Sequence, residues 1–451
     1  MVSVEKQNVI RFTKLRDGLA LAIMVAMILL SSLLASSFSV FAFHLLLFSL
    51  TLAFVQLTNK QHVFVYAIIL AVSLSFVLLV YQGNQQAYGV PYFNAGSDDL
   101  YFEINGDLIA KAGFLAPSKL LGTVLNVYDD ASFFAVILSL LVRFSEFFDG
   151  YSTFLPRILN AYSLVWILMI IEYLLDKHGG FSLEALRMTL LVVGLAPNIQ
   201  YINAHIFRDT VNFLQVLMIV LVFDKVVSSR NLRVAYLAML VPLVYMTFYT
   251  RANSLVFAAG LCLIISNEWL GVKKRYLLLG LAGLVLFSGF LEKIRFYTYI
   301  SIYSDYLSGG GLSDYVFRVP VLPFGVVLRA AYALISPLPL FSNLFMEPQR
   351  TILDILRTLT NLGVIIRIVF IPFIVKRVFK FDWLSMSFLC CFLGVIMTTF
   401  TFRHVLFYFP FMVALGVDGY LGSTKKVRAL LLLVGMFLPL ILGLLYSLLK
   451  V

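Results

Sequence analysis

The stretch from Val63 to Tyr81 reads VFVYAIILAVSLSFVLLVY, which is nineteen residues without a charged side chain. An α-helix needs about 20 mainly apolar residues to cross the hydrocarbon core of a bilayer, because it rises only about 1.5 Å per residue. Comparable apolar stretches recur along the whole sequence. The sequence therefore predicts a helical integral membrane protein.

The overall composition supports this prediction. Hydrophobic residues make up 61% of the 451 residues and charged residues 13%, whereas a soluble domain has roughly 45–50% and about 25%. The weak alternation typical of an outer-membrane barrel is absent. We predict an all-α polytopic bundle forming one membrane domain, 1–451, with about thirteen spans. They are expected near 18–38, 40–57, 63–81, 158–175, 184–200, 209–224, 234–250, 254–270, 276–291, 359–375, 383–400, 404–420 and 428–449.

The charge pattern argues against nucleic acid as a partner. The net charge is +11, but the Lys and Arg residues occur in short clusters beside apolar spans, where they set membrane topology. Three cysteines lie in apolar stretches without a CxxC spacing, so neither a disulfide framework nor a zinc site is indicated. The sequence also lacks a nucleotide-phosphate loop and a serine-hydrolase elbow, which argues against ATP-driven chemistry.

Two apolar stretches decide the predicted topology. Stretch 131–148 contains Arg143 and Glu146, and stretch 326–345 is broken by Ser-Pro-Leu-Pro at 336–339. If both are interfacial or re-entrant helices, the basic N-terminus and the basic loops all fall inside. Two long loop regions, 82–157 and 292–358, then lie outside, and loops of such length are usually functional or disordered. We expect short interfacial helices in both.

The first outer loop carries an acidic motif, PYFNAGSDDLYFEINGD, at positions 91–107. Ser97 is suited to cap a helix beginning at Asp98, which would place Asp99, Glu103 and Asp107 on one side. Neighbouring carboxylates could bind a divalent cation or act as a general base on a hydroxyl group. The alternative is a helix cap with a solvated acidic face.

Basic residues at the predicted outer ends of other spans form a second set of candidates. They are Arg208 with Asp209, Arg251, and Arg403 with His404. Arginine binds phosphate in a planar, bidentate geometry, so these residues predict a site for a phosphate or pyrophosphate on a lipid tail. Taken singly, each arginine could instead extend to the lipid headgroups, and His404 could be a general base or an ordinary interfacial histidine. Tyr101 and Arg318 are further candidates in the two loops.

These features together resemble a known class of membrane enzyme. The segment Asp98-Asp99-Leu100-Tyr101 in an outer loop, the many spans, the later Arg208-Asp209, and Arg403-His404 leading into Tyr408 and Pro410 are similar to the GT-C superfamily of glycosyltransferases. The chain is also similar to polytopic proteins of bacterial surface-polysaccharide clusters. The resemblance implies that Asp98 or Asp99 is the catalytic base, with Asp99 as ligand if a divalent cation (Mg or Mn) is used. It implies that Arg208, Arg251, Arg403 and His404 bind the phosphate of a polyprenyl-linked donor.

The expected function follows from that resemblance. The chain would be a glycosyltransferase of the bacterial inner membrane with a cytoplasmic N-terminus and a periplasmic site. It would transfer sugar from a polyprenyl-(pyro)phosphate donor, with a lipid-linked sugar or oligosaccharide and membrane lipid as partners. A repeat-unit polymerase is the nearest alternative, and it would depend more on the basic residues than on the aspartates. A transporter or flippase is the third, and it would require charges deep within the spans and paired broken helices.

Overall fold

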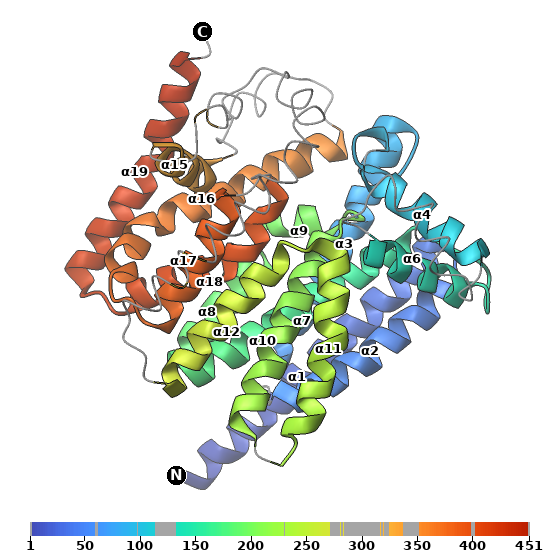
Figure 1. Ribbon diagram of the computed structural model, residues 1–451, viewed down its shortest axis with the longest axis horizontal. Helices are drawn as coiled ribbons and strands as arrows, with labels where there is room; N and C mark the ends of the chain where they lie inside the picture. Colours follow the sequence, from blue (N-terminus) through green and yellow to red (C-terminus); the bar gives the residue numbers. More distant parts are fainter. Residues whose placement is uncertain are drawn as a thin grey trace. The chain divides into compact units, whose positions relative to one another are not determined.

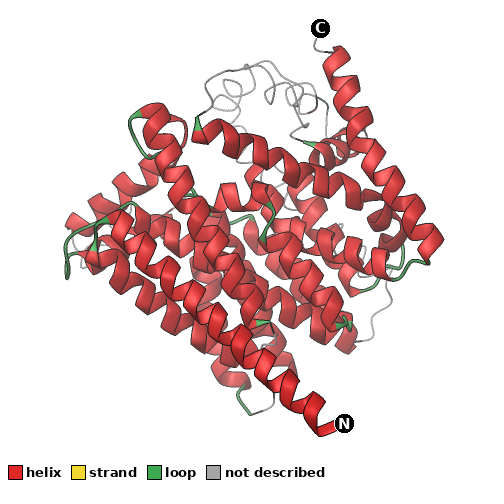
Figure 2. Cartoon of the chain, turned by 180° about the vertical axis from the view of Figure 1, so that it is seen from behind, coloured by secondary structure: helices red, strands yellow, loops and turns green. Residues whose placement is uncertain are grey.

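The computed structural model is helical wherever it describes the chain, and Figure 2 shows no strand among the described residues. The described part comprises residues 2–58, 62–96, 98–112, 132–229, 231–270, 324–336, 351–397 and 402–449, and the single positions 280, 283, 316 and 319. It divides into two compact units. Unit 1 contains 1–173, 190–214 and 348–357, and unit 2 contains 174–189, 215–347 and 358–451.

Unit 1 is built on long apolar helices near the N-terminus. Helix α1 (Val2–Ala35) packs against α2 (Phe38–Thr58) and α3 (Val63–Tyr88), and the three lie side by side in Figure 1. The end of α3 leads through the short turn η1 (Phe93–Ala95) into α4 (Asp98–Ala112). Helix α4 packs along α6 (Ser132–Ser145), and α9 (Pro197–Asn203) packs against α3. This arrangement fixes both ends of the acidic loop.

Unit 2 is centred on α18 (Val405–Leu421), which is buried along nearly its whole length. It packs against α17 (Trp383–Met397), which in turn contacts α12 (Ser254–Leu270) and α15 (Val326–Ile335). Helix α11 (Arg233–Arg251) packs on α12, and η5 (Phe402–His404) precedes α18. Gly419 permits a close approach, since a Cβ there would lie 2.6 Å from the backbone carbonyl of Phe373. Helix α19 (Lys425–Leu449) follows α18.

Four further helices contain residues assigned to both units. They are α7 (Phe154–Gly179), α8 (Leu183–Gly194), α10 (Asp209–Ser228) and α16 (Ile352–Val378).

The described helices confirm a multi-pass membrane protein. Eight are long and apolar enough to span a bilayer, or up to nine if the bent pair α8 and α9 forms one span. Those eight coincide with eight of the expected spans, and the bent pair, with its 55° angle, occupies 184–200. Stretches 254–270, 383–400 and 404–420 contain the shorter apolar helices α12, α17 and α18. The span expected at 276–291 lies outside the described residues, apart from positions 280 and 283.

The two stretches that decided the topology both form short helices. Among the described residues, α6 covers 14 positions and α15 covers 10, fewer than the roughly 20 needed to cross a bilayer. The end of α15 is held by the buried Arg367, which donates hydrogen bonds to the carbonyl oxygens of Ala333 and Ser336. A guanidinium inside a membrane helix therefore binds carbonyl groups that the end of α15 leaves without helical partners.

Candidate functional site

The loop that leads to the acidic motif has an unusual backbone. Asn94, Ala95 and Gly96 all have positive φ angles, of 47°, 65° and 115°. Asparagine and glycine tolerate this left-handed region, but alanine does so only at a cost of about 1–2 kcal/mol. Strain of this kind persists only where surrounding contacts hold it, and it is concentrated at functional sites.

Asp99 supplies one of those contacts. Helix α4 begins at Asp98, as the sequence predicts, while Ser97 lies outside the described residues. The Asp99 side chain is fully buried, and its carboxylate accepts hydrogen bonds from the backbone N–H groups of Phe93 at 2.7 Å and Leu100 at 3.1 Å. Burial raises the pKa of Asp99, partly offset by the Phe93 N–H and by the positive charge of Arg157. Asp98 is only half-buried, so it is the more accessible carboxylate of the pair.

Glu103 lies one turn along α4 on the same side as Asp99, as the four-residue spacing predicts. Its carboxylate accepts hydrogen bonds from the hydroxyl groups of Tyr92 at 2.6 Å and Tyr151 at 2.7 Å. Burial raises the pKa of Glu103, and the charge of Arg157 acts in the opposite direction. Burial and the Glu103 carboxylate raise the pKa of both tyrosines, so their hydroxyl groups remain donors.

Arg157 is a buried member of this cluster that the sequence analysis missed. Its side chain is 0% exposed, and it donates to the carbonyl oxygens of Thr153 and Pro91 and lies over the ring of Tyr81. Its Nε has no hydrogen-bond partner among the described residues. Its position near the start of an apolar helix resembles that of an ordinary interfacial arginine, and only the fold brings it to Pro91.

The other unit 1 candidates lie around α4 and the start of α10. The guanidinium of Arg208 lies 5.9 Å from the ring centre of Phe102, which belongs to the buried face of α4. Asp209 is buried at the first position of α10. Tyr101 is exposed on a different face of α4, and Asp107 forms an ion pair with Lys111. The structure thus brings Arg208 to the acidic helix and turns Tyr101 away from its buried face.

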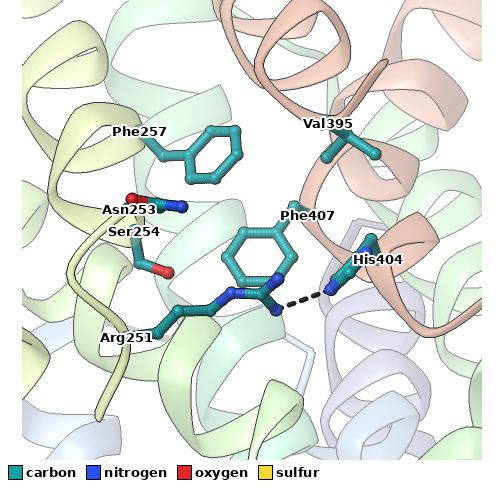
Figure 3. Close-up of a pocket in the computed structure, with 7 residues that line it drawn as sticks. All are labelled: Arg251, Asn253, Ser254, Phe257, Val395, His404 and Phe407. Atoms are coloured by element: carbon teal, nitrogen blue, oxygen red, sulfur yellow. Dashed lines mark hydrogen bonds between the residues drawn. The ribbon is translucent and has the colours of Figure 1, made fainter. Parts of the chain in front are cut away.

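Unit 2 contains the second site, a small pocket formed by Arg251 and His404 (Figure 3). The two side chains point toward one another, and Nη1 of Arg251 lies 2.6 Å from Nε2 of His404. A guanidinium can only donate, so Nε2 must accept and the imidazole carries its proton on Nδ1. Arg403 precedes His404 in η5 and is half-buried.

The pocket combines polar and apolar walls. Asn253 and Ser254 provide polar side chains, while Phe257, Val395 and Phe407 provide apolar ones. Arg251 ends α11 and His404 precedes α18, so two segments 153 residues apart meet here. A guanidinium, an imidazole, an amide and a hydroxyl beside aromatic rings suit a phosphate ester that carries an apolar chain.

A further exposed arginine, Arg357 in unit 1, was also missed. It donates to the Tyr88 hydroxyl at 2.9 Å and to Oδ1 of Asn94 at 3.3 Å. After Asp99 and Arg157, it is therefore the third side chain that binds this loop. In the sequence, Arg357 is distinguished only by its position at the end of the second long loop region, 292–358. Arg318 lies outside the described residues.

The described residues do not fit a metal site at the acidic motif. They contain no group of three His, Cys, Asp or Glu side chains able to hold an ion together. Asp99, the expected ligand, already accepts backbone N–H donors with both carboxylate oxygens.

No protein-family model, curated protein or solved structure matches the chain. The assignment of a function therefore depends on the chemistry of the two clusters, one in each unit.

Proposed function

We propose that the chain is a glycosyltransferase of bacterial surface-glycan assembly that uses a polyprenyl-(pyro)phosphate-linked sugar at the periplasmic face of the inner membrane. The observation that carries the proposal is the pairing of Arg251 with His404 in one pocket. Both residues were predicted separately as phosphate ligands from distant positions in the sequence. A guanidinium and an imidazole with polar and aromatic neighbours suit, by their chemistry, the phosphate of such a donor and the apolar chain attached to it.

The proposed reaction is an inverting displacement. An acceptor hydroxyl loses its proton to a carboxylate, its oxygen forms a bond to the anomeric carbon, and the bond from that carbon to the phosphate oxygen breaks. The negative charge develops on the lipid phosphate, and fixed cationic donors such as Arg251 stabilise it without a nucleotide. Of the carboxylates in the motif we propose Asp98 as the base, because it is only half-buried whereas Asp99 and Glu103 are buried.

A repeat-unit polymerase remains the second candidate, and one observation favours it. Two of the three carboxylates of the motif, Asp99 and Glu103, are buried and hydrogen-bonded within the protein. A polymerase that depends mainly on arginine and histidine would need these carboxylates only to shape the loop.

The test compares single variants in a strain that lacks its own copy of the protein. Asp98→Asn, Arg251→Ala and Arg403→Ala are expressed, their membrane abundance is checked, and surface glycan is quantified by gel electrophoresis. Asp107→Asn serves as the control, because it alters an exposed carboxylate on the same helix. We expect the three variants to lose glycan at normal abundance while the control keeps it. Loss in the arginine variants alone would select the polymerase, and normal glycan in all strains would refute both.

A further inference from the structure

The end of α16 and the start of α19, both in unit 2, carry a concentration of positive charge. Stretches 376–382 and 418–428 together contain six Lys or Arg residues and two Asp residues. Both aspartates, Asp382 and Asp418, form ion pairs with the buried Arg377. Their negative charges are therefore offset within the protein, and the other basic side chains determine the charge of this surface.

A contact between the two helix ends brings three exposed lysines together. Nζ of Lys376, on the last turn of α16, donates a hydrogen bond to Oγ of Ser423 at 2.7 Å. Ser423 precedes Lys425 by two residues, and two residues of chain span at most about 7 Å. Lys425 and Lys426 begin α19, and all three lysines are exposed. We call Lys376, Lys425 and Lys426 the lysine patch.

The turn that carries the patch is fixed by Arg428. Its guanidinium donates to the carbonyl oxygens of Tyr420 at 3.1 Å and Ser423 at 3.3 Å, and it lies over the ring of Tyr420. Further along α19, a Cβ on Gly435 would lie 2.6 Å from the carbonyl oxygen of Val369, so α19 and α16 are in close contact (Figure 1). Arg428 is thus used within the protein, whereas the lysine patch faces outward.

An exposed apolar stripe on α19 begins at the patch. Lys426 is followed at helical spacing by Leu430, Leu433 and Phe437, whose side chains are 61%, 54% and 54% exposed. Residues at this spacing share one face of a helix. Helix α19 is long and apolar enough to span a bilayer, and only 17% of its apolar window is buried within the protein. The stripe therefore faces lipid tails, and the patch lies where the stripe meets the headgroups.

We propose that the lysine patch binds the headgroup of an anionic phospholipid, with an acyl chain of that lipid along the stripe of Leu430, Leu433 and Phe437. Clusters of lysine at the end of a membrane span attract anionic headgroups, and the predicted topology places these helix ends inside. A zwitterionic lipid has the same phosphate but also a choline cation, which the lysines repel. This inference goes beyond the proposed function and does not depend on it.

Native mass spectrometry of the purified full-length protein in detergent measures the binding. The protein is titrated with phosphatidylglycerol and, separately, with phosphatidylcholine that carries the same acyl chains. We expect the wild type to bind phosphatidylglycerol more tightly than phosphatidylcholine. In Lys425→Gln/Lys426→Gln, the affinity for phosphatidylglycerol should fall by about fivefold for each lysine removed, because each loses one attraction to the negative headgroup. The affinity for phosphatidylcholine should not fall.

The matched control is Lys111→Gln/Arg187→Gln, which removes the same charge from two exposed side chains on other helices. It should bind phosphatidylglycerol as the wild type does, because neither side chain belongs to the patch. Thermal unfolding checks that each variant is folded. If the double patch variant does not accumulate, Lys425→Gln and Lys426→Gln are measured singly.

Inorganic phosphate distinguishes a lipid site from a site for free phosphate. Added at the concentration of the lipid, it should leave phosphatidylglycerol bound, because it has no acyl chain to pack along the stripe. Displacement of the lipid by phosphate would overturn the proposal. So would equal affinity of the wild type for the two lipids, or a phosphatidylglycerol affinity that is the same in the patch variant and the control.

Discussion

The carboxylate of Asp99 binds the backbone N–H of Phe93, six residues earlier, at 2.7 Å. This bond closes the turn in which three consecutive residues have positive φ. The acidic pair is therefore divided in its structural roles: Asp99 holds the turn, and the neighbouring Asp98 is left the more accessible.

That division predicts different effects on stability for the two aspartates. Asp99→Ala leaves two backbone N–H groups without their acceptor and should lower the free energy of unfolding by about 1–3 kcal/mol for each buried donor left unsatisfied. Asp98→Ala should lower it by less, because Asp98 is only half-buried whereas Asp99 is fully buried. Thermal unfolding in nanodiscs measures both. Equal losses of unfolding free energy in the two variants would contradict the conclusion that Asp99, rather than Asp98, holds the turn.

The left-handed turn leads us to predict opposite changes in stability for substitutions at its adjacent residues Ala95 and Gly96. Ala95→Gly should stabilise the protein by up to about 1 kcal/mol, because glycine adopts a φ of 65° without strain. Gly96→Ala should destabilise it, since its φ is 115° and the new Cβ would lie 2.8 Å from Cδ2 of Leu100. The melting temperatures of the two variants should therefore move in opposite directions. A lower melting temperature for Ala95→Gly would show that the turn is not held as described.

Glu103 should make stability depend on pH. Burial raises its pKa above the ordinary value of 4.5, so the folded state retains the proton to higher pH than the unfolded chain does. The stabilising effect is complete below pH 4.5 and is lost as the pH rises through the raised pKa. Glu103→Gln removes this titration, so the melting temperature of the wild type relative to the variant should fall with rising pH above 4.5. A constant difference across that range would argue against a raised pKa.

Much of the membrane architecture could be predicted because span length and hydropathy are local properties. The break at 184–200 was harder to predict: Pro197 marks a helix start, but the 55° bend becomes evident only once α9 packs on α3.

Part of the candidate site could also be predicted, because the spacing of residues along a helix is a local property of the sequence. The spacing of Asp99 and Glu103 fixes their common side on a helix, so this relationship could be derived from the sequence. Which carboxylate is buried depends on the packing of α4 against α6, which hydropathy does not determine. Arg157 was missed because its partner carbonyl, that of Pro91, is 66 residues away in the sequence.

Helix α11 is the least covered of the eight candidate spans among the described residues, with α19 and α1 close behind at 17% and 18%. Only 11% of its apolar window is buried within the protein, compared with 78% for α10. Lipid tails adapt to any apolar outline, whereas neighbouring side chains require a particular volume. Over evolutionary time the sequence of α11 is therefore free to drift among Leu, Ile, Val and Phe, while each change in α10 must be matched by a change in a residue that it touches.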